Sequence, residues 1–263
     1  MSSTMSRNKS YRLQSISCLL IGIIWQLLSM IYPSILIPSP YETWQALVLL
    51  VTSGDLASQF AISGLRMLIG FLIGSVFASA CGLIAGRYAT VFEMFRPIVS
   101  FLLGIPPIIL VVIAMVWFGT NTMIPIMVVA ILVFPTFFLN IANGYQQIDP
   151  HLLEMATIYK KSKSVQLKKI IFPSLMIPFF TAFSLAAGGS VRITIMAELL
   201  GTNNGMGAAI SLARINIDTA KVFAWTFVSI TTIILIDVCI INPLKKRIMK
   251  YQEDTYATSN SSK

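Results

Sequence analysis

The sequence predicts an all-α membrane protein, a polytopic bundle of about six transmembrane helices. Of the 263 residues, 56% are hydrophobic and only 11% are charged, whereas a soluble domain of this length usually carries about 25% charged residues. The mean hydropathy is +0.80. Apolar runs of about 20 residues, the length that a helix needs to cross a bilayer, recur along the chain. We therefore do not expect an ordinary cytosolic enzyme.

Six apolar segments are long enough to be spans. The first is interpreted as an uncleaved helix because no small-residue cleavage site, of the kind that ends a secretory signal, follows it. The third contains two consecutive prolines and is still expected to be one span. In chain order the six are Ser15–Tyr32, Phe60–Ala85, Phe92–Phe118, Met123–Asn140, Ser174–Leu200 and Val222–Leu244. Together they predict one transmembrane domain over residues 15–244.

The basic residues sort to alternate loops. If the N-terminus is cytoplasmic, the cytoplasmic segments are the arm 1–14, the loop Gly86–Arg96, the loop 143–172 and the tail 245–263. These segments hold fifteen of the 19 lysines and arginines. An excess of Lys and Arg marks the cytoplasmic side of a membrane protein. Both termini are therefore predicted to be cytoplasmic, and the net charge of +9 reflects topology, so no nucleic-acid partner is expected.

The second predicted span carries a small residue at every fourth position. Lipid gives helices no hydrophobic drive to associate, so close approach over small residues must supply the packing. The row consists of Gly70, Gly74, Ala78, Gly82 and Gly86. It predicts a groove against which a neighbouring helix packs.

Four ionisable residues lie inside predicted spans, where such side chains are costly and usually face a cavity or a partner. Arg66 is near the outer end of its span, so we expect it to extend toward the interface. Arg192 lies about 12 Å of helical rise from the outer end of the fifth span, and it should line water or pair with an acid. Glu198, six residues later, belongs to a different helix face. Asp237 fits either a contact between helices or a role in the pathway.

Other reactive residues give no sign of catalysis. Cys18, Cys81 and Cys239 lie in spans without paired spacing, as inert buried thiols do. The chain has one histidine, His151, so neither a histidine metal site nor a catalytic triad is expected. The stretch Gly201–Gly207 lacks the Lys-Ser/Thr of a phosphate-binding loop. We predict neither an enzyme nor a cofactor or metal site in this chain.

The loop 143–172 is long and amphipathic in two pieces. Asp149 followed by Pro150 is typical of a helix start. A first apolar stripe and a second one, separated by the polar Lys160–Ser162, predict two short helices that form a cytoplasmic knob. A helix lying on anionic lipid is the alternative. The first stripe is Leu152, Leu153, Ala156 and Tyr159, and the second is Val165–Ile171, ending before Pro173.

A spacing pattern in this loop resembles the cytoplasmic motif of the integral-membrane permeases of binding-protein-dependent ABC importers. That motif reads Glu-Ala-Ala, three residues, Gly, nine residues, Ile, one residue, Leu-Pro. The matching positions are Glu154, Met155, Ala156, Lys160, Ile170, Phe172 and Pro173. Met155, Lys160 and Phe172 depart from it. Because glycine adopts a left-handed turn cheaply and lysine does not, we expect the turn at Lys160 to be shaped differently here.

Further segments resemble the nitrate/sulfonate/taurine-type branch of these permeases, over about residues 35–250. They are Pro38-Ser39-Pro40 before Trp44, Arg66 before Gly70, Ile105-Pro106-Pro107 before Trp117-Phe118-Gly119, and Ala197–Gly201 followed by Gly205-Met206-Gly207.

The resemblance implies a type I ABC importer permease fold in a bacterial cytoplasmic membrane. It implies that the loop 143–172 is a coupling loop, docked on a partner ATPase that carries the ATP. Glu154 would face a basic residue there, and the small Ala156 would let the helix sit close. It also implies a second permease copy, as a homodimer, and an external binding protein, for which Arg214 and Asp218 are the candidate contacts. A stand-alone ion- or proton-coupled carrier is the alternative, although such carriers often show inverted repeats and this chain shows no convincing one.

Overall fold

The computed structural model describes residues 7–244 of the chain, and the side chains from Ile16 onward except Cys18. The described part is helical and contains no strand, which confirms the all-α prediction. The predicted tail 245–263 lies outside the described residues. In chain order the elements are α1 (Arg7–Ile31), α2 (Pro40–Thr52), α3 (Asp55–Arg87), α4 (Ala89–Gly104), α5 (Pro107–Phe118), α6 (Met123–Gln146), α7 (Pro150–Ile158), α8 (Lys163–Gln166), the π-helix η1 (Leu167–Ile171), α9 (Phe172–Gly201), α10 (Met206–Ile215), α11 (Thr219–Ile236) and the π-helix η2 (Asp237–Ile241).

Four helices within residues 7–244 are long and apolar enough to cross a membrane. They are α3, α6, the continuous stretch Lys163–Gly201 that ends with α9, and the stretch Thr219–Leu244 that begins with α11. The pair α4 and α5 would supply a fifth crossing. In α1 the apolar segment Leu19–Ile31 is shorter than these spans. The chain is therefore a multi-pass helical membrane protein.

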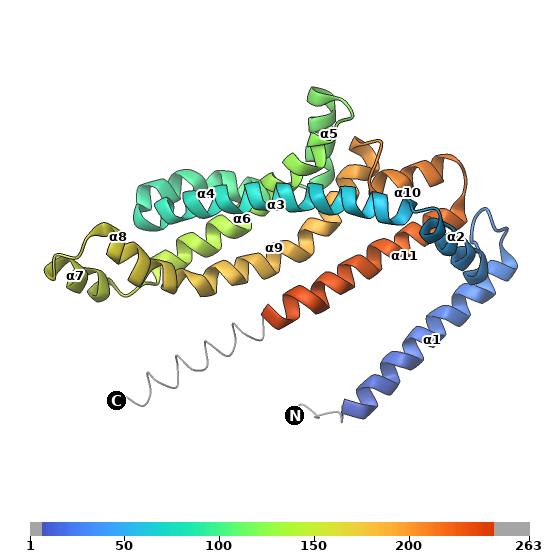
Figure 1. Ribbon diagram of the computed structural model, residues 1–263, viewed down its shortest axis with the longest axis horizontal. Helices are drawn as coiled ribbons and strands as arrows, with labels where there is room; N and C mark the ends of the chain where they lie inside the picture. The colour runs from blue at the N-terminus through green and yellow to red at the C-terminus, as the bar shows by residue number, and fades with distance from the viewer. Residues whose placement is uncertain (1–6, 245–263) are drawn as a thin grey trace.

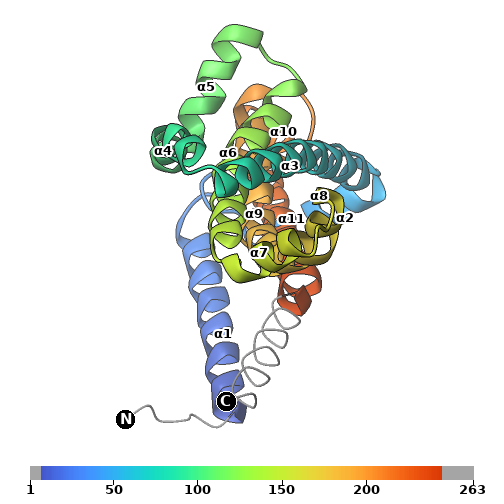
Figure 2. The same ribbon diagram turned by 90° about the vertical axis from the view of Figure 1, so that its left-hand side faces the viewer.

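The third predicted span, Phe92–Phe118, is not one helix. It breaks between α4 and α5, whose axes differ by 99°. Pro106 disfavours helical backbone at the residue before it, and Ile105 is accordingly extended, with ψ at 128°. Pro107 then occupies the first turn of α5, where a missing N–H is harmless. As a result α5 projects away from the body of the molecule, upward in both views (Figures 1 and 2).

The centre of the molecule is α6, which packs most extensively on α3 and then on α9. The small-residue row of α3 faces α6, as the sequence predicts. A Cβ added at Gly70 would lie 2.6 Å from the carbonyl oxygen of Ile126, and one added at Gly74 would lie 2.5 Å from that of Ala130. The two backbones therefore approach too closely for larger side chains. Phenylalanine rings fill the adjoining core, among them Phe71 against Phe137 at 5.7 Å between ring centroids.

The two ends of this bundle carry different elements. In Figure 1, α7 and α8 lie at one end and α2 and α10 at the other. Helix α1 diverges from the body in both views (Figures 1 and 2). Its Trp25 stacks on Phe223 and Phe227 at centroid distances of 5.8 and 5.5 Å. The indole N–H of Trp25 also donates to the carbonyl of Pro38 at 3.0 Å.

Candidate functional site

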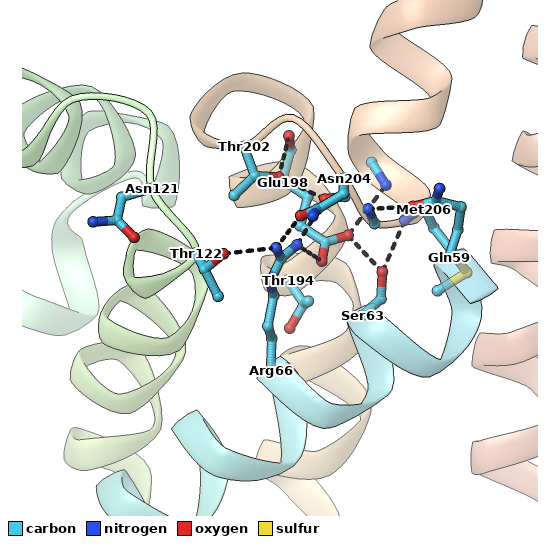
Figure 3. Close-up of polar contacts among 12 residues, drawn as sticks. Gln59, Ser63, Arg66, Asn121, Thr122, Thr194, Glu198, Thr202, Asn204 and Met206 are labelled. Atoms are coloured by element: carbon cyan, nitrogen blue, oxygen red, sulfur yellow. Dashed lines mark hydrogen bonds and ion pairs between the residues drawn. The ribbon is translucent and has the colours of Figure 1, made fainter.

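A buried polar cluster joins α3 to α9 (Figure 3). We call it the outer cluster after the side of the membrane on which the distribution of basic residues predicts it to lie. Arg66 of α3 is 3% exposed and Glu198 of α9 is fully buried. Arg66 Nη1 donates to Glu198 Oε1 at 2.8 Å, and Ser63 Oγ donates to Glu198 Oε2 at 2.6 Å. The expectation that Arg66 extends toward the interface is wrong, because a buried carboxylate lies within reach and compensates its charge. Ser63, one turn before Arg66 on the same helix face, is a member that the sequence analysis missed.

The guanidinium of Arg66 also holds the turn after α9. Nη1 donates to the backbone carbonyl of Asn204 at 2.7 Å, and Nη2 donates to the Asn204 side-chain oxygen. Nη2 further donates to Thr122 Oγ1 at 3.1 Å, just before α6 begins. One side chain thus ties together α3, the start of α6 and the turn between α9 and α10.

Glu198 in turn caps the N-terminus of α10. The N–H of Gly207 donates to Glu198 Oε2 at 3.2 Å, and the N–H of Met206 donates to Ser63 Oγ at 2.8 Å. The positive end of the helix dipole favours the carboxylate at this place. Gly205, with φ at 102°, lies against the carboxylate so closely that any Cβ there would overlap it. The glycine-rich stretch Gly201–Gly207 is therefore folded around Glu198.

Arg192 and Asp237 are not part of the outer cluster. Arg192 is exposed on α9, on a different face from the buried Glu198, as the six-residue spacing predicts. Asp237, the first residue of η2, is half-buried. A Cβ added at Gly188 of α9 would lie 3.3 Å from Asp237 Oδ1. Among the described residues, neither charge has a hydrogen bond or an ion pair with a side chain.

At the opposite end of the molecule, the loop 143–172 contains the short helix α7, as the sequence predicts. The second predicted short helix is not separate, because α8 and η1 continue into α9 as one helical stretch, Lys163–Gly201. Leu153 packs in a cluster with Ile170 and Ile171 and with Ile141 and Tyr145 of α6. This cluster fixes α7 and η1 to the end of α6 that lies away from the outer cluster. Figure 2 shows α7 and α8 from this end.

The exposed face of α7 agrees with the predicted stripe at Leu152 and Tyr159 but not at Leu153 and Ala156. Ala156 is only 9% exposed and is covered by the chain itself, so it does not present the close-fitting surface that the resemblance implies. Met155 is 52% exposed, Ile158 77% and Tyr159 69%. Ile158 could not be predicted as exposed, because the spacing alone does not say on which side of α7 the body lies. Glu154 is also exposed, 3.6 Å from His151 Nδ1.

The expectation of an altered turn at Lys160 is wrong. Lys160 has φ at 49°, in the left-handed region. Its N–H donates to the carbonyl of Thr157 at 2.9 Å, and the N–H of Lys161 donates to that of Ala156 at 2.9 Å. This pair of bonds is the Schellman helix end that glycine usually makes. The lysine therefore keeps the glycine conformation at an energetic cost. Phe172 and Pro173, which end the motif, are both exposed.

The two candidate contacts near the outer cluster differ from each other. Arg214 is exposed. Asp218 caps α11 by accepting from the N–H of Lys221 at 3.1 Å and forms an ion pair with Lys221 Nζ at 2.9 Å. Burial raises the pKa of Asp218, but the hydrogen bonds and charge of Lys221 outweigh it, so the pKa is lowered. Beside them lies an open groove of about 720 Å³ whose lining includes Glu42 and Asn216.

Comparison with known proteins identifies relatives that cover most of the chain. Residues 70–241 match the family described as the binding-protein-dependent transport system inner membrane component. The chain is 27% identical over 203 residues to the putative aliphatic sulfonates transport permease protein SsuC of Bacillus subtilis, which covers 76% of this chain and 74% of the relative. The protein of the same name from Escherichia coli is 30% identical over 198 residues, covering 74% and 75%.

Two further likenesses concern a shorter region and the fold. The bicarbonate transport system permease protein CmpB of Synechococcus elongatus is 30% identical over 135 residues, 51% of this chain and 49% of the relative. A solved structure of the inward-facing MetNI methionine ABC transporter matches with a TM-score of 0.52 and 14% identity, covering 75% of this chain and 92% of that chain. That likeness confirms the type I importer permease fold.

Proposed function

Because the chain belongs to the inner membrane components of binding-protein-dependent transport systems, in the nitrate/sulfonate branch of ABC permeases, we propose that it couples a partner ATPase to the uptake of a small solute. Two identical copies would form the translocation pathway between them. The solute would arrive on an external binding protein, and ATP would be bound by the ATPase. The basic residues that cluster in alternate loops support an orientation with both termini in the cytoplasm.

The observation that carries this proposal is the exposed apolar face of α7. Met155, Ile158 and Tyr159 are exposed together on a short, lysine-rich segment outside the long helices. Contiguous exposed apolar side chains with a polar rim are typical of a protein interface. Next to them is an open groove of about 470 Å³, lined in part by Glu154 and by Arg87 at the end of α3. A segment of the ATPase would fill this groove and cover the apolar face.

The anchoring of α7 explains how a movement of the ATPase would be transmitted to the long helices. Leu153 and Ile171 hold α7 and η1 against α6, and η1 runs without interruption into α9. A displacement of α7 therefore moves long helices as packed bodies, the kind of domain motion by which transporters change access. At the other end, the groove beside Arg214 and Asp218 is the surface that we assign to the binding protein.

The experiment is co-purification of the ATPase with the tagged permease. The double variant Met155→Glu/Ile158→Glu places two carboxylates on the apolar face, and we expect at least a tenfold loss of bound ATPase. Folding should be unaffected because both side chains are exposed. Lys163→Glu/Lys168→Glu is the matched control, with two exposed positions in the same loop, and should retain the ATPase within about twofold. Unchanged co-purification of the Met155/Ile158 variant would contradict the coupling assignment.

A second measurement separates the importer from an ion-coupled carrier. Depleting ATP while the proton gradient is maintained should stop uptake by the importer. Uptake that continues under these conditions, and stops when the gradient is collapsed, would instead identify a carrier that acts alone.

A further inference from the structure

An apolar groove of about 350 Å³ runs between α3, α6 and α9. Ala80 and Leu83 of α3 line one side of it, and Phe172, Met176 and Phe179 of α9 line the other. In Figure 1 the end of α3 and the start of α9 lie at the end of the molecule that carries α7. Phe172 and Met176 are 68% and 46% exposed, so the chain itself leaves the groove open.

The groove has the length of one membrane leaflet. Along α9 it reaches from Phe172 to Phe180, which are eight residues and about 12 Å of helical rise apart. Half of a hydrocarbon layer is roughly 15 Å thick. An acyl chain that lies parallel to α9 would therefore follow the groove without leaving its own leaflet.

Both sides of the groove continue into a cation at the end nearest the loop. Arg87 lies four residues after Leu83, and side chains four residues apart share a helix face. Lys168 of η1 lies four residues before Phe172, in the helical stretch that continues into α9. Both cations are exposed, and within residues 7–244 neither forms an ion pair with an acid. The groove thus ends in two uncompensated positive charges.

The lining of the groove is complementary to a molecule with a long hydrocarbon part and one anionic end. Among the described residues that line it, none is charged and Ser79 alone is polar. A polar solute would need several placed polar groups along the walls. Basic pockets between membrane helices on the cytoplasmic side are typical sites for anionic lipid headgroups. The basic residues of the loops predict the same side for this end of the chain.

We propose that this groove binds an anionic phospholipid. One acyl chain lies along α9 from Phe172 to Phe180, and the phosphate lies between Arg87 and Lys168. The lipid fills the space that the chain leaves open between α3 and the first turns of α9. This site is separate from the face of α7 that we assign to the ATPase, and it does not depend on that assignment.

The test compares two lipids that differ in headgroup charge. The full chain in detergent micelles is titrated with dioleoylphosphatidylglycerol, which is anionic, and with dioleoylphosphatidylcholine, which is zwitterionic. Native mass spectrometry counts the lipids that each chain retains. A cation beside an anionic lipid contributes about fivefold in affinity, so two cations should give a preference of roughly 25-fold for phosphatidylglycerol.

Charge variants assign this preference to the end of the groove. Arg87→Gln/Lys168→Gln should remove the roughly 25-fold preference and leave the affinity for phosphatidylcholine unchanged. Because Arg87 also lines the groove beside α7, Lys168→Gln is measured alone, and it should lower the preference about fivefold. Lys161→Gln/Lys163→Gln, at two exposed positions of the same loop, is the matched control. It should change the preference by less than about twofold, because neither lysine lies within one turn of the groove.

A second pair of variants tests the apolar part of the groove. Ala80→Trp places an indole among the lining residues and should weaken the binding of both lipids by at least about tenfold, through loss of the buried hydrocarbon. Ala80 is exposed, so the fold should tolerate the larger side chain. Ala61→Trp, at an exposed position near the other end of α3, is the control and should bind both lipids as the parent does.

Three results would overturn the proposal. They are equal affinities of the parent for the two lipids, a preference that survives in the Arg87/Lys168 variant, and unchanged lipid binding by the Ala80→Trp chain. If Ala80→Trp lowers the fraction of permease dimer and leaves lipid binding unchanged, a second copy of the chain covers the groove instead. The coupling assignment is tested separately, because the Lys168→Gln chain should still co-purify with the ATPase.

Discussion

The outer cluster and the α7–η1 loop hold their residues in opposite ways. In the outer cluster the charges of Arg66 and Glu198 are buried and each has its partners within the chain. In the loop, Leu153 and Ile171 anchor the segment, while Met155 and Ile158 face outward. Both Nη groups of Arg66 and both carboxylate oxygens of Glu198 are hydrogen-bonded, although Arg66 Nε is buried without a partner. Such a network of buried polar groups favours one geometry, whereas the anchored α7 leaves an apolar face exposed. The polar side chains at one end of the permease are therefore held by bonds within the chain, whereas the apolar side chains at the other end are exposed.

The largest expected change in stability comes from removing the ion pair between Arg66 and Glu198. Glu198→Ala leaves the Arg66 guanidinium buried without its carboxylate, and removal of one partner of a buried pair costs about 3–5 kcal/mol. The free energy of unfolding, measured by denaturation in mixed detergent micelles, should fall by that amount. Glu93→Ala is the control, because it breaks the exposed pair of Arg96 and Glu93 at 3.3 Å and should cost less than about 1 kcal/mol. Similar losses in both variants would contradict the contrast between the two ends.

A smaller effect is expected at Gly207, where the first turn of α10 packs against α9. A Cβ at this position would overlap the backbone carbonyl of Ile195, so Gly207→Ala should lower the free energy of unfolding by about 1–3 kcal/mol through overpacking. Gly104→Ala is the control, since a Cβ there meets no atom within 4 Å and should leave stability unchanged or slightly higher. If the Gly207 variant is as stable as the control, the start of α10 can move away from α9 without loss of stability, and the overpacking argument is wrong.

The smallest effect is a gain at the loop end. Lys160 adopts the left-handed backbone, which costs a non-glycine residue about 1–2 kcal/mol. Glycine would remove this cost, but its greater conformational entropy in the unfolded chain offsets part of the gain. Lys160→Gly should therefore raise the midpoint of thermal unfolding, with a gain of at most about 1 kcal/mol. Lys161→Gly, next to it and without positive φ, should give no gain. A loss of stability in the Lys160 variant would indicate that the lysine side chain makes a contact that matters more than its backbone strain.

Sequence reasoning succeeded where the signal is local. The small-residue row of α3, the helix start at Asp149 and the spacing of the loop motif each depend on a few neighbouring residues, and each corresponds to the observed packing or helix. Arg66 could not be placed in this way, since its partner Glu198 is 132 residues away in the chain. The outward face of α7 likewise depends on where α6 lies. The sequence shows Pro106 and Pro107, but the 99° angle between α4 and α5 depends on backbone geometry that residue types alone do not give.

The break between α4 and α5 has a consequence for the surroundings of the protein. Helix α5 has 12 residues, which rise about 18 Å, less than the roughly 30 Å of a hydrocarbon layer. Its Val116 and Trp117 are 77% and 74% exposed, and irregular backbone at membrane depth is tolerated only beside protein or water. The corner at Pro106 therefore needs protein or water beside it, and no described residue of this chain covers the exposed side chains of Val116 and Trp117.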